Sequence, residues 1–428
     1  MTARHACTGR LAWLLTLALA CPAPARQSPQ PPAPTALSLD DAVRLGLERN
    51  PSLRQAGFDV DAARARALQA GLYPNPTVGV LGEEIGRRGG IYTLPQVSQE
   101  LVTADKLGLG RAVADRQADQ AVLALERQRL ALLTSVRQAY FEALAAQRRV
   151  EALGELVRLA DEALTNAERL RQVQRLAELD VLQFRVERDR LRADLDAAER
   201  ELPAARRRLA AAVGVADLPP APLAGSLEGP LPDYDFDRAR ALVVAGHPEA
   251  RSADVGVARA QIALRREEAE VVPNVTVSGG YQRNANEREN EGRFEVSVPV
   301  PLWNRNQGNV RAAQAEVGRA VAEAERVRLD LAGRLATAYG RYAAARGRAE
   351  RYRGDVLPAA RRGYALSLEA FQGGQFEYLR VIQAQRAVRE AYLEYLRSLA
   401  EAWGAAAEVA GLASEPDCWP AQAALPPP

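Results

Sequence analysis

Apolar residues recur at alternating spacings of four and three along the stretch from Arg111 to Gln172, which contains one glycine, Gly154, and no proline. The residues that follow this spacing are Leu132, Val136, Ala139, Ala143, Ala146, Val150, Leu153, Val157, Ala160, Leu164 and Ala167. A repeat of about 3.5 residues is typical of a helix that packs along one coiled-coil seam. At about 1.5 Å per residue this helix would be about 90 Å long, so the pattern predicts an extended rod.

The same seam returns 199 residues later in the chain. Its residues are Leu335, Ala338, Tyr342, Ala345, Ala349, Tyr352, Val356 and Ala359. Further along, the correspondence shifts to 200 residues, because Leu179–Gln183 matches Leu379–Gln383. A long stretch that occurs twice indicates an internal duplication.

Shorter helices precede each long one. We expect a helix over Leu37–Asn50, capped by Ser38 and stopped at Asn50-Pro51, and a matching helix over Phe236–His247 that stops at His247-Pro248. Second helices are predicted over Leu53–Ala70 and Ala250–Ala269, and proline breaks follow them at Leu72–Pro76 and Val272–Asn274.

Alternation with a period of two follows each break and predicts strands. In the second copy the strands are expected over Val275–Gln282 and Phe294–Val300, with a hydrophilic loop over Arg283–Glu291; the matching loop of the first copy is Glu83–Gly90. Strands of about ten residues with one apolar face suit the wall of an outer-membrane barrel. A periplasmic β-sandwich shows the same alternation, so both readings stay open on the pattern alone.

Each half therefore reads as two helices, two strands and a long helical hairpin. The turns fall at Gln172–Arg175 and Gln372–Gln375, the returning helices run over Leu176–Val213 and Phe376–Ala410, and Pro358 should kink the second long helix. The expected divisions are a signal peptide (1–25), a Pro-rich leader (26–36), a first repeat (37–216; strands 72–102, helical hairpin 103–214), a linker (217–235), a second repeat (236–412; strands 271–302, helical hairpin 303–411) and a tail (413–428).

The fold class that follows is mainly α, with long helical hairpins and four strands, internally duplicated. Four strands cannot close a membrane barrel, which needs about eight or more. The chain must therefore oligomerise or form no barrel.

The first residues have the layout of a secretory signal, with Arg4 and Arg10 before the apolar run Leu11–Ala20. The run is too short to span a membrane, so we expect export. Cleavage after Ala25 is one alternative. The other is lipidation of Cys21, since Ala18-Leu19-Ala20-Cys21 resembles a loose lipobox.

Composition excludes several classes of function. A formal net charge of +2 gives no sign of a nucleic-acid partner. After the signal, His247 is the one histidine and methionine is absent, so we expect no metal site and no cofactor. No nucleophile elbow or phosphate loop appears, so an exported enzyme is not favoured, and His247 reads as part of a helix stop. A long coiled-coil interaction protein without a channel would also explain the seams, but not the strand pairs or the duplication.

Taken together, these features resemble the TolC-like outer membrane efflux proteins. The resemblance covers about Leu37 to Leu412 and rests on Leu72-Tyr73-Pro74-Asn75-Pro76, Val272-Pro273-Asn274, Val296–Leu302, Trp303–Gly308 and the ends of the two helical hairpins. The Pro-Leu-Trp-Asn-Arg-Asn-Gln-Gly stretch is most similar to the heavy-metal, cobalt-zinc-cadmium type branch.

The resemblance implies a TolC-like trimeric α/β-barrel in the outer membrane of a Gram-negative bacterium, embedded in outer-membrane lipid. It implies a homotrimer that works with a periplasmic adaptor and an inner-membrane pump of the resistance-nodulation-division class. The function implied is passive conduction of exported substrates, with heavy-metal cations favoured. Channels for drug efflux or type I protein secretion are the alternatives, and a periplasmic coiled-coil protein is a further one.

The resemblance also implies site residues. In the family a Val-Gly-Leu or Val-Gly-Thr pattern at each hairpin turn meets the adaptor; the matching positions are Val173, Gln174, Arg175 and Leu176, and Gly373, Gly374, Gln375 and Phe376. The first turn has lost its glycine. The family often places carboxylates at the tunnel entrance, and the matching residues are Asp180, Gln183, Arg380 and Gln383. Only Asp180 is acidic, so a simple acidic ring is not expected. Because the chain after the signal has no methionine and His247 is its one histidine, we expect metal selection to lie in the pump and adaptor.

Overall fold

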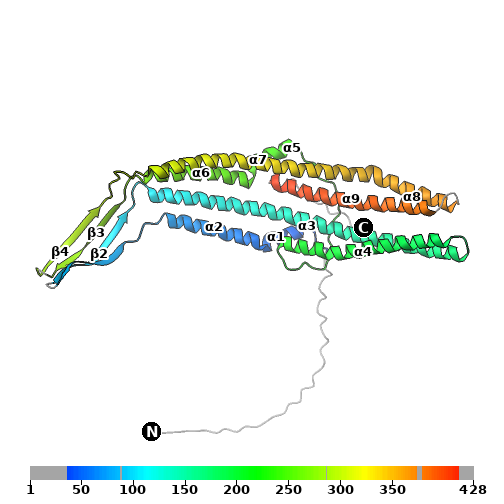
Figure 1. Ribbon diagram of the computed structural model, residues 1–428, viewed down its shortest axis with the longest axis horizontal. Helices are drawn as coiled ribbons and strands as arrows, with labels where there is room; N and C mark the ends of the chain where they lie inside the picture. Colours follow the sequence, from blue (N-terminus) through cyan, green and yellow to red (C-terminus); the bar gives the residue numbers. More distant parts are fainter. Residues whose placement is uncertain (1–35, 87–88, 286, 374–377, 414–428) are drawn as a thin grey trace, which may run out of the picture. The chain divides into compact units, whose positions relative to one another are not determined.

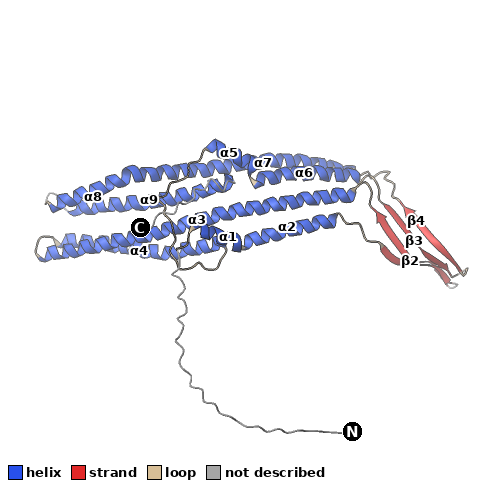
Figure 2. Ribbon diagram, turned by 180° about the vertical axis from the view of Figure 1, so that it is seen from behind, coloured by secondary structure: helices blue, strands red, loops and turns tan. Residues whose placement is uncertain are grey.

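The structure, a computed structural model, describes residues 36–86, 89–285, 287–373 and 378–413 (Figure 1). Its elements are α1 (Leu39–Arg49), α2 (Pro51–Ala70), β1 (Thr77–Gly86), β2 (Gly89–Leu101), α3 (Lys106–Gln172), α4 (Glu178–Val213), α5 (Phe236–Gly246), α6 (Pro248–Ala269), β3 (Val275–Asn284), β4 (Glu289–Ser297), α7 (Gln307–Arg351), a π-helical turn (Tyr352–Val356), α8 (Leu357–Gln372) and α9 (Tyr378–Ala413). The predicted fold class is confirmed: long helices dominate, and four strands lie together at one end of them (Figure 2). The signal peptide, Cys21, the leader as far as Thr35 and the tail from residue 414 lie outside the described residues.

Two residues each stop one helix and start the next. Asn50 ends α1 and caps α2, where its Oδ1 accepts the Ser52 N–H at 2.9 Å. His247 ends α5 and caps α6, where its Nδ1 accepts the Glu249 N–H at 3.2 Å. The proline that follows each of them lacks an N–H that the first helical turn does not need. The predicted stops are therefore also starts.

The four strands form one antiparallel sheet in the order β1-β2-β3-β4. The strands are longer at the loop ends than predicted, since Asn284 pairs with Glu289 and Gly86 with Gly89. The two hydrophilic segments were wrongly expected to be all loop. In the first, Glu83, Gly86 and Gly89 pair across the ladder, and in the second Arg283, Asn284 and Glu289–Glu291 do so. β4 was also wrongly expected to reach Val300. It ends at Ser297, and proline residues follow at 299 and 301, which cannot donate to a ladder.

The two faces of the sheet differ in polarity. A row across the ladder joins Val78, Val97, Gly279 and Phe294, and the side chain of Phe294 is 75% exposed. The next row joins polar residues Thr77, Ser98, Ser278 and Glu295 and lies on the opposite face, because successive side chains of a strand alternate. One face is thus apolar and exposed, while the other carries polar groups.

The helices pack in a regular series. α2 contacts α3, α3 contacts α6 and α6 contacts α7, while α4 and α9 lie along the other half of α3. The first seam behaves as predicted: none of its residues is exposed, and Val136, Ala143 and Leu153 are at most 1% exposed. Within the described residues, no helix has a stretch apolar enough to cross a membrane.

The second seam departs from the prediction at its far end. Val356 and Ala359 were expected to face inward and are exposed, whereas Leu357 is buried and Ala360 is partly buried. The cause is the π-helical turn, in which the Leu357 N–H reaches the Tyr352 carbonyl and one extra residue is accommodated. That residue explains why the correspondence between the copies changes from 199 to 200. The interruption expected from Pro358 is present, in the form of this π-turn directly before it.

The largest core lies where the linker crosses the helices. Phe141 of α3 stacks on Trp403 of α9 with ring centroids 4.7 Å apart, and the Trp403 indole N–H donates to the Leu227 carbonyl at 2.9 Å. The Tyr140 hydroxyl oxygen lies 2.5 Å from the Ala224 carbonyl and 3.0 Å from the Leu37 carbonyl, so its one proton is shared between these two acceptors. Segments from both copies and the linker thus share one hydrophobic core.

Lys106 ties the copies together next to the sheet. It is the chain's single lysine, it begins α3, and it is 7% exposed. Its ammonium donates to the Val272 carbonyl at 2.6 Å and to Asn274 Oδ1 at 2.8 Å, with Glu270 at 3.5 Å. The break of the second copy is therefore held by the long helix of the first.

The stability of the α5–α6 corner should depend on pH. Burial lowers the pKa of His247; Glu249 opposes this effect, and Arg334 and Arg127 reinforce it. Below the unfolded pKa of about 6.5 the unfolded chain binds the extra proton, so stability falls as the pH falls through that value. His247→Asn, which reproduces the cap formed by Asn50, should flatten the decline of the thermal unfolding midpoint between about pH 7 and pH 5. An identical decline in the variant would contradict this role.

Candidate functional site

The first hairpin turn has a defined backbone geometry. The Arg175 N–H donates to the Leu170 carbonyl and the Gln174 N–H to the Arg171 carbonyl, both at 2.9 Å, which is the pattern of a Schellman motif. Gln174 adopts the left-handed conformation, with φ of 56°. Glycine usually fills this position, and an L-residue there costs about 1 kcal/mol. The turn therefore keeps the conformation that suits glycine although the sequence has lost it.

In the second hairpin, the structure describes α8 as far as Gly373 and the returning helix from Tyr378. Gly373 caps α8 and its N–H donates to the Glu369 carbonyl at 3.0 Å. The predicted adaptor residues Gly374, Gln375 and Phe376 lie outside the described residues. At the first turn Val173 is 63% exposed, Gln174 and Arg175 are exposed, and Leu176 is half-buried. The first turn and Gly373 thus present exposed groups at the ends of the long helices.

One hydrophobic cluster brings the two hairpin ends together. Its buried members are Leu164, Ala167, Val181, Phe184, Val381 and Ile382. Leu176, Tyr364, Leu368 and Phe371 pack against it. The cluster contains residues of α3, α4 and α9, so the ends of the first and second repeats are in contact within one chain.

The predicted entrance residues flank this cluster. Asp180 and Arg380 each precede a buried valine, Val181 and Val381, so the structure brings their backbone positions to the same end of the helices. Asp180 is half-buried, whereas Arg380 and Gln383 are exposed. Gln183 is half-buried, and its Oε1 is buried with no hydrogen-bond partner among the described residues. Asp180 also lies in the first turn of α4, where an acid stabilises the helix dipole.

Sequence reasoning missed a buried ion cluster close to these residues. Glu187 of α4 is 5% exposed, and its carboxylate receives Arg386 Nε at 2.8 Å and Arg389 Nη1 at 2.9 Å, both from α9. The cluster joins the two hairpins by charge-assisted bonds to a buried carboxylate, while the Arg386 side chain stays partly exposed. Removing one member of such a cluster leaves buried charge without compensation.

A signal for Glu187 was present in the sequence. Val181, Phe184, Leu191 and Ala198 are buried along one side of α4, and Glu187 takes a position in that series where an apolar residue would be expected. A lone charge in a seam usually marks a specific partner across it. The partners could not be found from spacing, because they belong to the other repeat.

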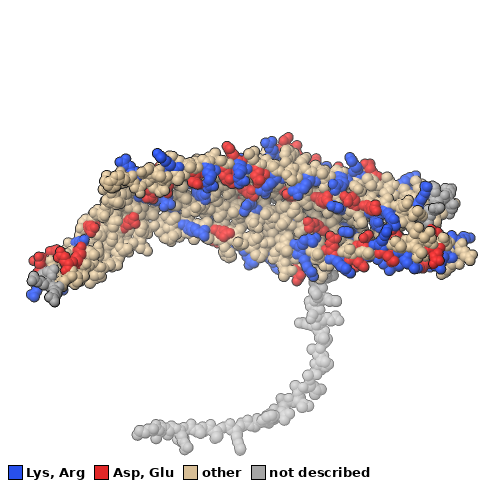
Figure 3. All heavy atoms as spheres, in the orientation of Figure 1, with Lys and Arg blue, Asp and Glu red and all other residues tan. Residues whose placement is uncertain are grey.

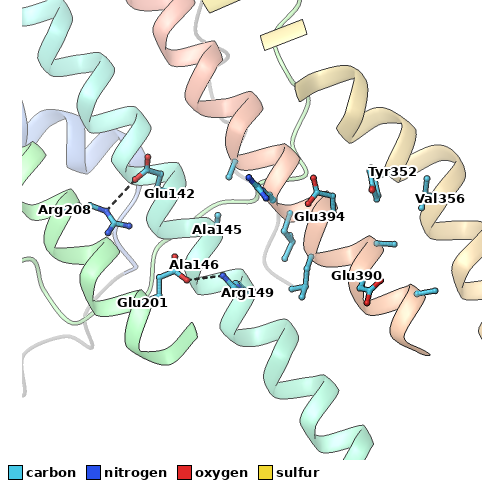
Figure 4. Close-up of a pocket in the computed structure, with 16 residues that line it drawn as sticks. Glu142, Ala145, Ala146, Arg149, Glu201, Arg208, Tyr352, Val356, Glu390 and Glu394 are labelled. Carbon is cyan, nitrogen blue, oxygen red and sulfur yellow. Dashed lines mark hydrogen bonds and ion pairs between the residues drawn. The ribbon is translucent and has the colours of Figure 1, made fainter. Parts of the chain in front are cut away.

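An open groove lies between α3 and α4 on one side and α9 and the π-turn on the other (Figure 4). Its volume is about 1060 Å³, and carboxylates and guanidinium groups line it beside alanines. Arg149 pairs with Glu201 at 3.1 Å across α3 and α4. On the face of the helices that Figure 3 shows, acidic and basic side chains are interspersed. The part of the chain that is described holds no group of three or more His, Cys, Asp or Glu able to bind a metal ion.

The model of the outer membrane efflux protein family matches residues 42–215 and 242–412. The chain belongs to this family. The two matched segments fall on the two series of elements described above. The family consists of channels and not of enzymes, and the expected TolC-like resemblance is confirmed.

Relatives support the same assignment. The chain is 26% identical to the cobalt-zinc-cadmium resistance protein CzcC of Cupriavidus metallidurans over 373 residues, which is 87% of this chain and 89% of the relative. Among solved structures it is similar to a membrane protein from Pseudomonas aeruginosa (TM-score 0.76, 19% identity, 88% and 92% of the two chains). It is also similar to CusC, for which transmembrane channel formation is described (TM-score 0.75, 17% identity, 88% and 91%). This efflux protein therefore shares its fold with known channels, and its likeness to the cobalt-zinc-cadmium type is confirmed.

The Glu187 cluster should stabilise the contact between hairpin ends. Glu187→Gln keeps the shape of the side chain but removes the negative charge, so we expect a loss of about 2 kcal/mol, since Arg386 is partly solvated. Hydrogen exchange should accelerate in the adjoining turns of α4 and α9. The control is Glu168→Gln, which breaks an exposed pair with Arg185 at 3.3 Å and should change little. Equal effects of both variants would refute a special role for Glu187.

Proposed function

We propose that three copies of this efflux protein form one channel of a tripartite efflux system in the outer membrane of a Gram-negative bacterium. The observation that carries the proposal is the four-stranded sheet whose outer strands, β1 and β4, are edges within the described chain. Edge strands expose unpaired backbone groups, which are costly in lipid and are removed by pairing with another strand.

The sheet has the polarity that a barrel wall needs. Its exposed apolar face would meet lipid, and its polar face would line the pore. Three copies of four strands supply twelve, which is sufficient to close a barrel around an open lumen. The helices would continue the channel into the periplasm as a tunnel.

The hairpin ends are the proposed docking points for the other components. Val173, Gln174, Arg175, Leu176 and Gly373, with Gly374, Gln375 and Phe376, would meet a periplasmic adaptor, and the adaptor would connect the channel to an inner-membrane pump of the resistance-nodulation-division class. The left-handed Gln174 supports the proposal for the first turn, since the backbone shape there does not depend on glycine.

We propose heavy-metal cations as the exported substrate. The support is the similarity to a protein of cobalt-zinc-cadmium resistance along nearly the whole chain. Conduction would be passive and unselective, because the described residues offer no clustered metal ligands, and selection would then lie in the pump and adaptor. Loss of the gene should lower tolerance to cobalt, zinc or cadmium salts. Loss of drug tolerance or of protein secretion instead would favour the alternative substrates.

The channel itself is tested by purification. Extracted from outer membranes in detergent, the protein should have the mass of a trimer and should produce discrete conductance steps in planar lipid bilayers. A monodisperse monomer that keeps its helicity without detergent would overturn the proposal and favour a coiled-coil protein of the periplasm.

The entrance is tested by charge changes at Arg380. If three copies each of Asp180 and Arg380 face one narrowing, opposite charges about 4 Å apart attract by about 1 to 4 kcal/mol, depending on the dielectric. Arg380→Ala should therefore raise single-channel conductance, and Arg380→Asp should raise it further by repulsion from Asp180. Arg185→Ala, at an exposed pair farther along α4, is the control. Unchanged conductance in intact Arg380 variants would place the gate elsewhere.

A further inference from the structure

The two repeats meet inside the chain where α3 packs on α6. Arg251 Nη1 of α6 lies 2.9 Å from Glu126 Oε2 of α3. Further along the same contact, the Gln120 side chain donates to the Ser252 carbonyl at 3.0 Å and also lies against Gly256. Residue numbers rise along α6 as they fall along α3, so the contact is antiparallel.

Each of these helices has a counterpart in the other repeat. α7 corresponds to α3 at a distance of 199 residues, and the correspondence is fixed by burial, because Leu132 and Val136 match Leu331 and Leu335. α2 corresponds to α6 at a distance of 197 residues, fixed by the shared caps and first-turn prolines of Asn50-Pro51 and His247-Pro248.

These offsets in residue number identify the residues of α7 and α2 that correspond to those in contact between α3 and α6, and the corresponding residues carry complementary charges. Arg251 corresponds to Arg54 of α2, and Glu126 corresponds to Glu325 of α7, so the same two residue types recur. Gly256 corresponds to Asp59, and Gln120 corresponds to Arg319. The uncharged contact of Gln120 with Gly256 thus corresponds to a pair of opposite charges, Arg319 and Asp59. The order of the two pairs along the helices is antiparallel, as it is between α3 and α6.

The faces that carry these residues are open in the single chain. Arg54 and Glu325 are exposed and have no ion-pair partner among the described residues. Phe58 lies beside Asp59 and is 71% exposed, and Leu329 lies one turn beyond Glu325 and is 74% exposed. Their counterparts in the other repeat, Val255 and Leu130, are half-buried. Phe58 and Leu329 are therefore more exposed in the single chain than the residues that correspond to them in the other repeat.

We propose that α2 of one protomer packs on α7 of the next, with ion pairs from Arg54 to Glu325 and from Asp59 to Arg319 across the boundary. The contact between repeats inside the chain is then copied between chains, and the series α2, α3, α6, α7 continues around a closed ring. This inference rests on the proposed trimeric channel and adds to it the residues that hold the boundary.

A second copy of this chain fits the surface better than an adaptor does. The opposing charges and exposed apolar residues occur on both faces of the same chain, and each face finds its complement on the other. A head-to-tail contact of this kind generates a ring when the rotation closes. For an adaptor, by contrast, no matching set of charges and apolar residues is known from this chain.

Cross-linking tests the boundary. Cys418 is the one cysteine that follows Cys21 in the sequence, so it is first replaced by serine. In this Cys418→Ser background, Arg54→Cys with Glu325→Cys should give covalent dimers and trimers on denaturing gels when the detergent-purified protein reacts with a short bismaleimide. The reagent is chosen because a direct disulfide requires Cα atoms within about 7 Å, which side chains as long as Arg and Glu do not ensure. The matched control, Glu126→Cys with Arg251→Cys, should cross-link within one chain and migrate as a monomer. Each single-cysteine variant should give severalfold less covalent multimer than the Arg54 and Glu325 pair.

Charge reversal provides a second measurement. Arg54→Glu and Glu325→Arg should each lower the temperature at which the trimer dissociates, and the double variant should recover at least half of the loss. A trimer of correct mass that gives no multimer with Arg54→Cys and Glu325→Cys, while the control pair reacts, overturns this inference and leaves the proposed function intact. A protein that is monomeric before any cysteine is introduced overturns the proposed function. Additive losses in the double reversal also refute the ion pair.

Discussion

The structure depends on keeping two alanine-rich seams in register over the length of very long helices. In α3 the spacing of four and three keeps its apolar residues turned inward from Leu132 to Ala167. In the second repeat the same spacing alone would leave the last part of the helix facing the wrong way. The π-helical turn at Tyr352–Val356 inserts one residue, so Leu357 takes the place expected for Val356. Beyond this turn, Tyr364, Leu368 and Phe371 of α8 pack against the hydrophobic cluster that joins Val181 to Val381 at the hairpin ends.

Much of this architecture could be predicted because it follows from local chemistry. The seams are periodic, and Asn50-Pro51 and His247-Pro248 combine a cap with a residue that cannot continue the preceding helix. The π-turn was not predicted, because nothing in Tyr352–Val356 itself demands it. The sequence indicated it only through the offset between matching segments, which changes from 199 to 200 residues. The strand ends were misjudged since charged residues such as Glu289 pair across the ladder as well as apolar ones do.

The candidate site was predicted less completely than the fold. The first hairpin turn lies between α3 and α4, at the end of the predicted helix, while the residues predicted for the second turn after Gly373 lie outside the described part of the chain. The left-handed Gln174 shows that a turn can keep its backbone shape without the residue that normally marks it. Glu187 was overlooked because its partners, Arg386 and Arg389, lie about two hundred residues away and only the packing of α4 on α9 reveals them. Interactions within a helix follow from the spacing of residues along the sequence, whereas interactions between the repeats do not.

The burial of Lys106 has a practical consequence for anyone who handles this protein. A lysine-specific protease has a single peptide bond to recognise in the whole sequence, and that bond lies where α3 begins, with the side chain 7% exposed and its ammonium engaged by Val272 and Asn274. The protease would not cleave the chain while the contacts of Lys106 beside the sheet are intact. It would cut the chain into two defined fragments once this region unfolds locally. Amine-directed dyes would likewise label the folded chain poorly at this position. Cleavage or labelling at Lys106 therefore indicates whether the contacts between the two repeats beside the sheet are formed.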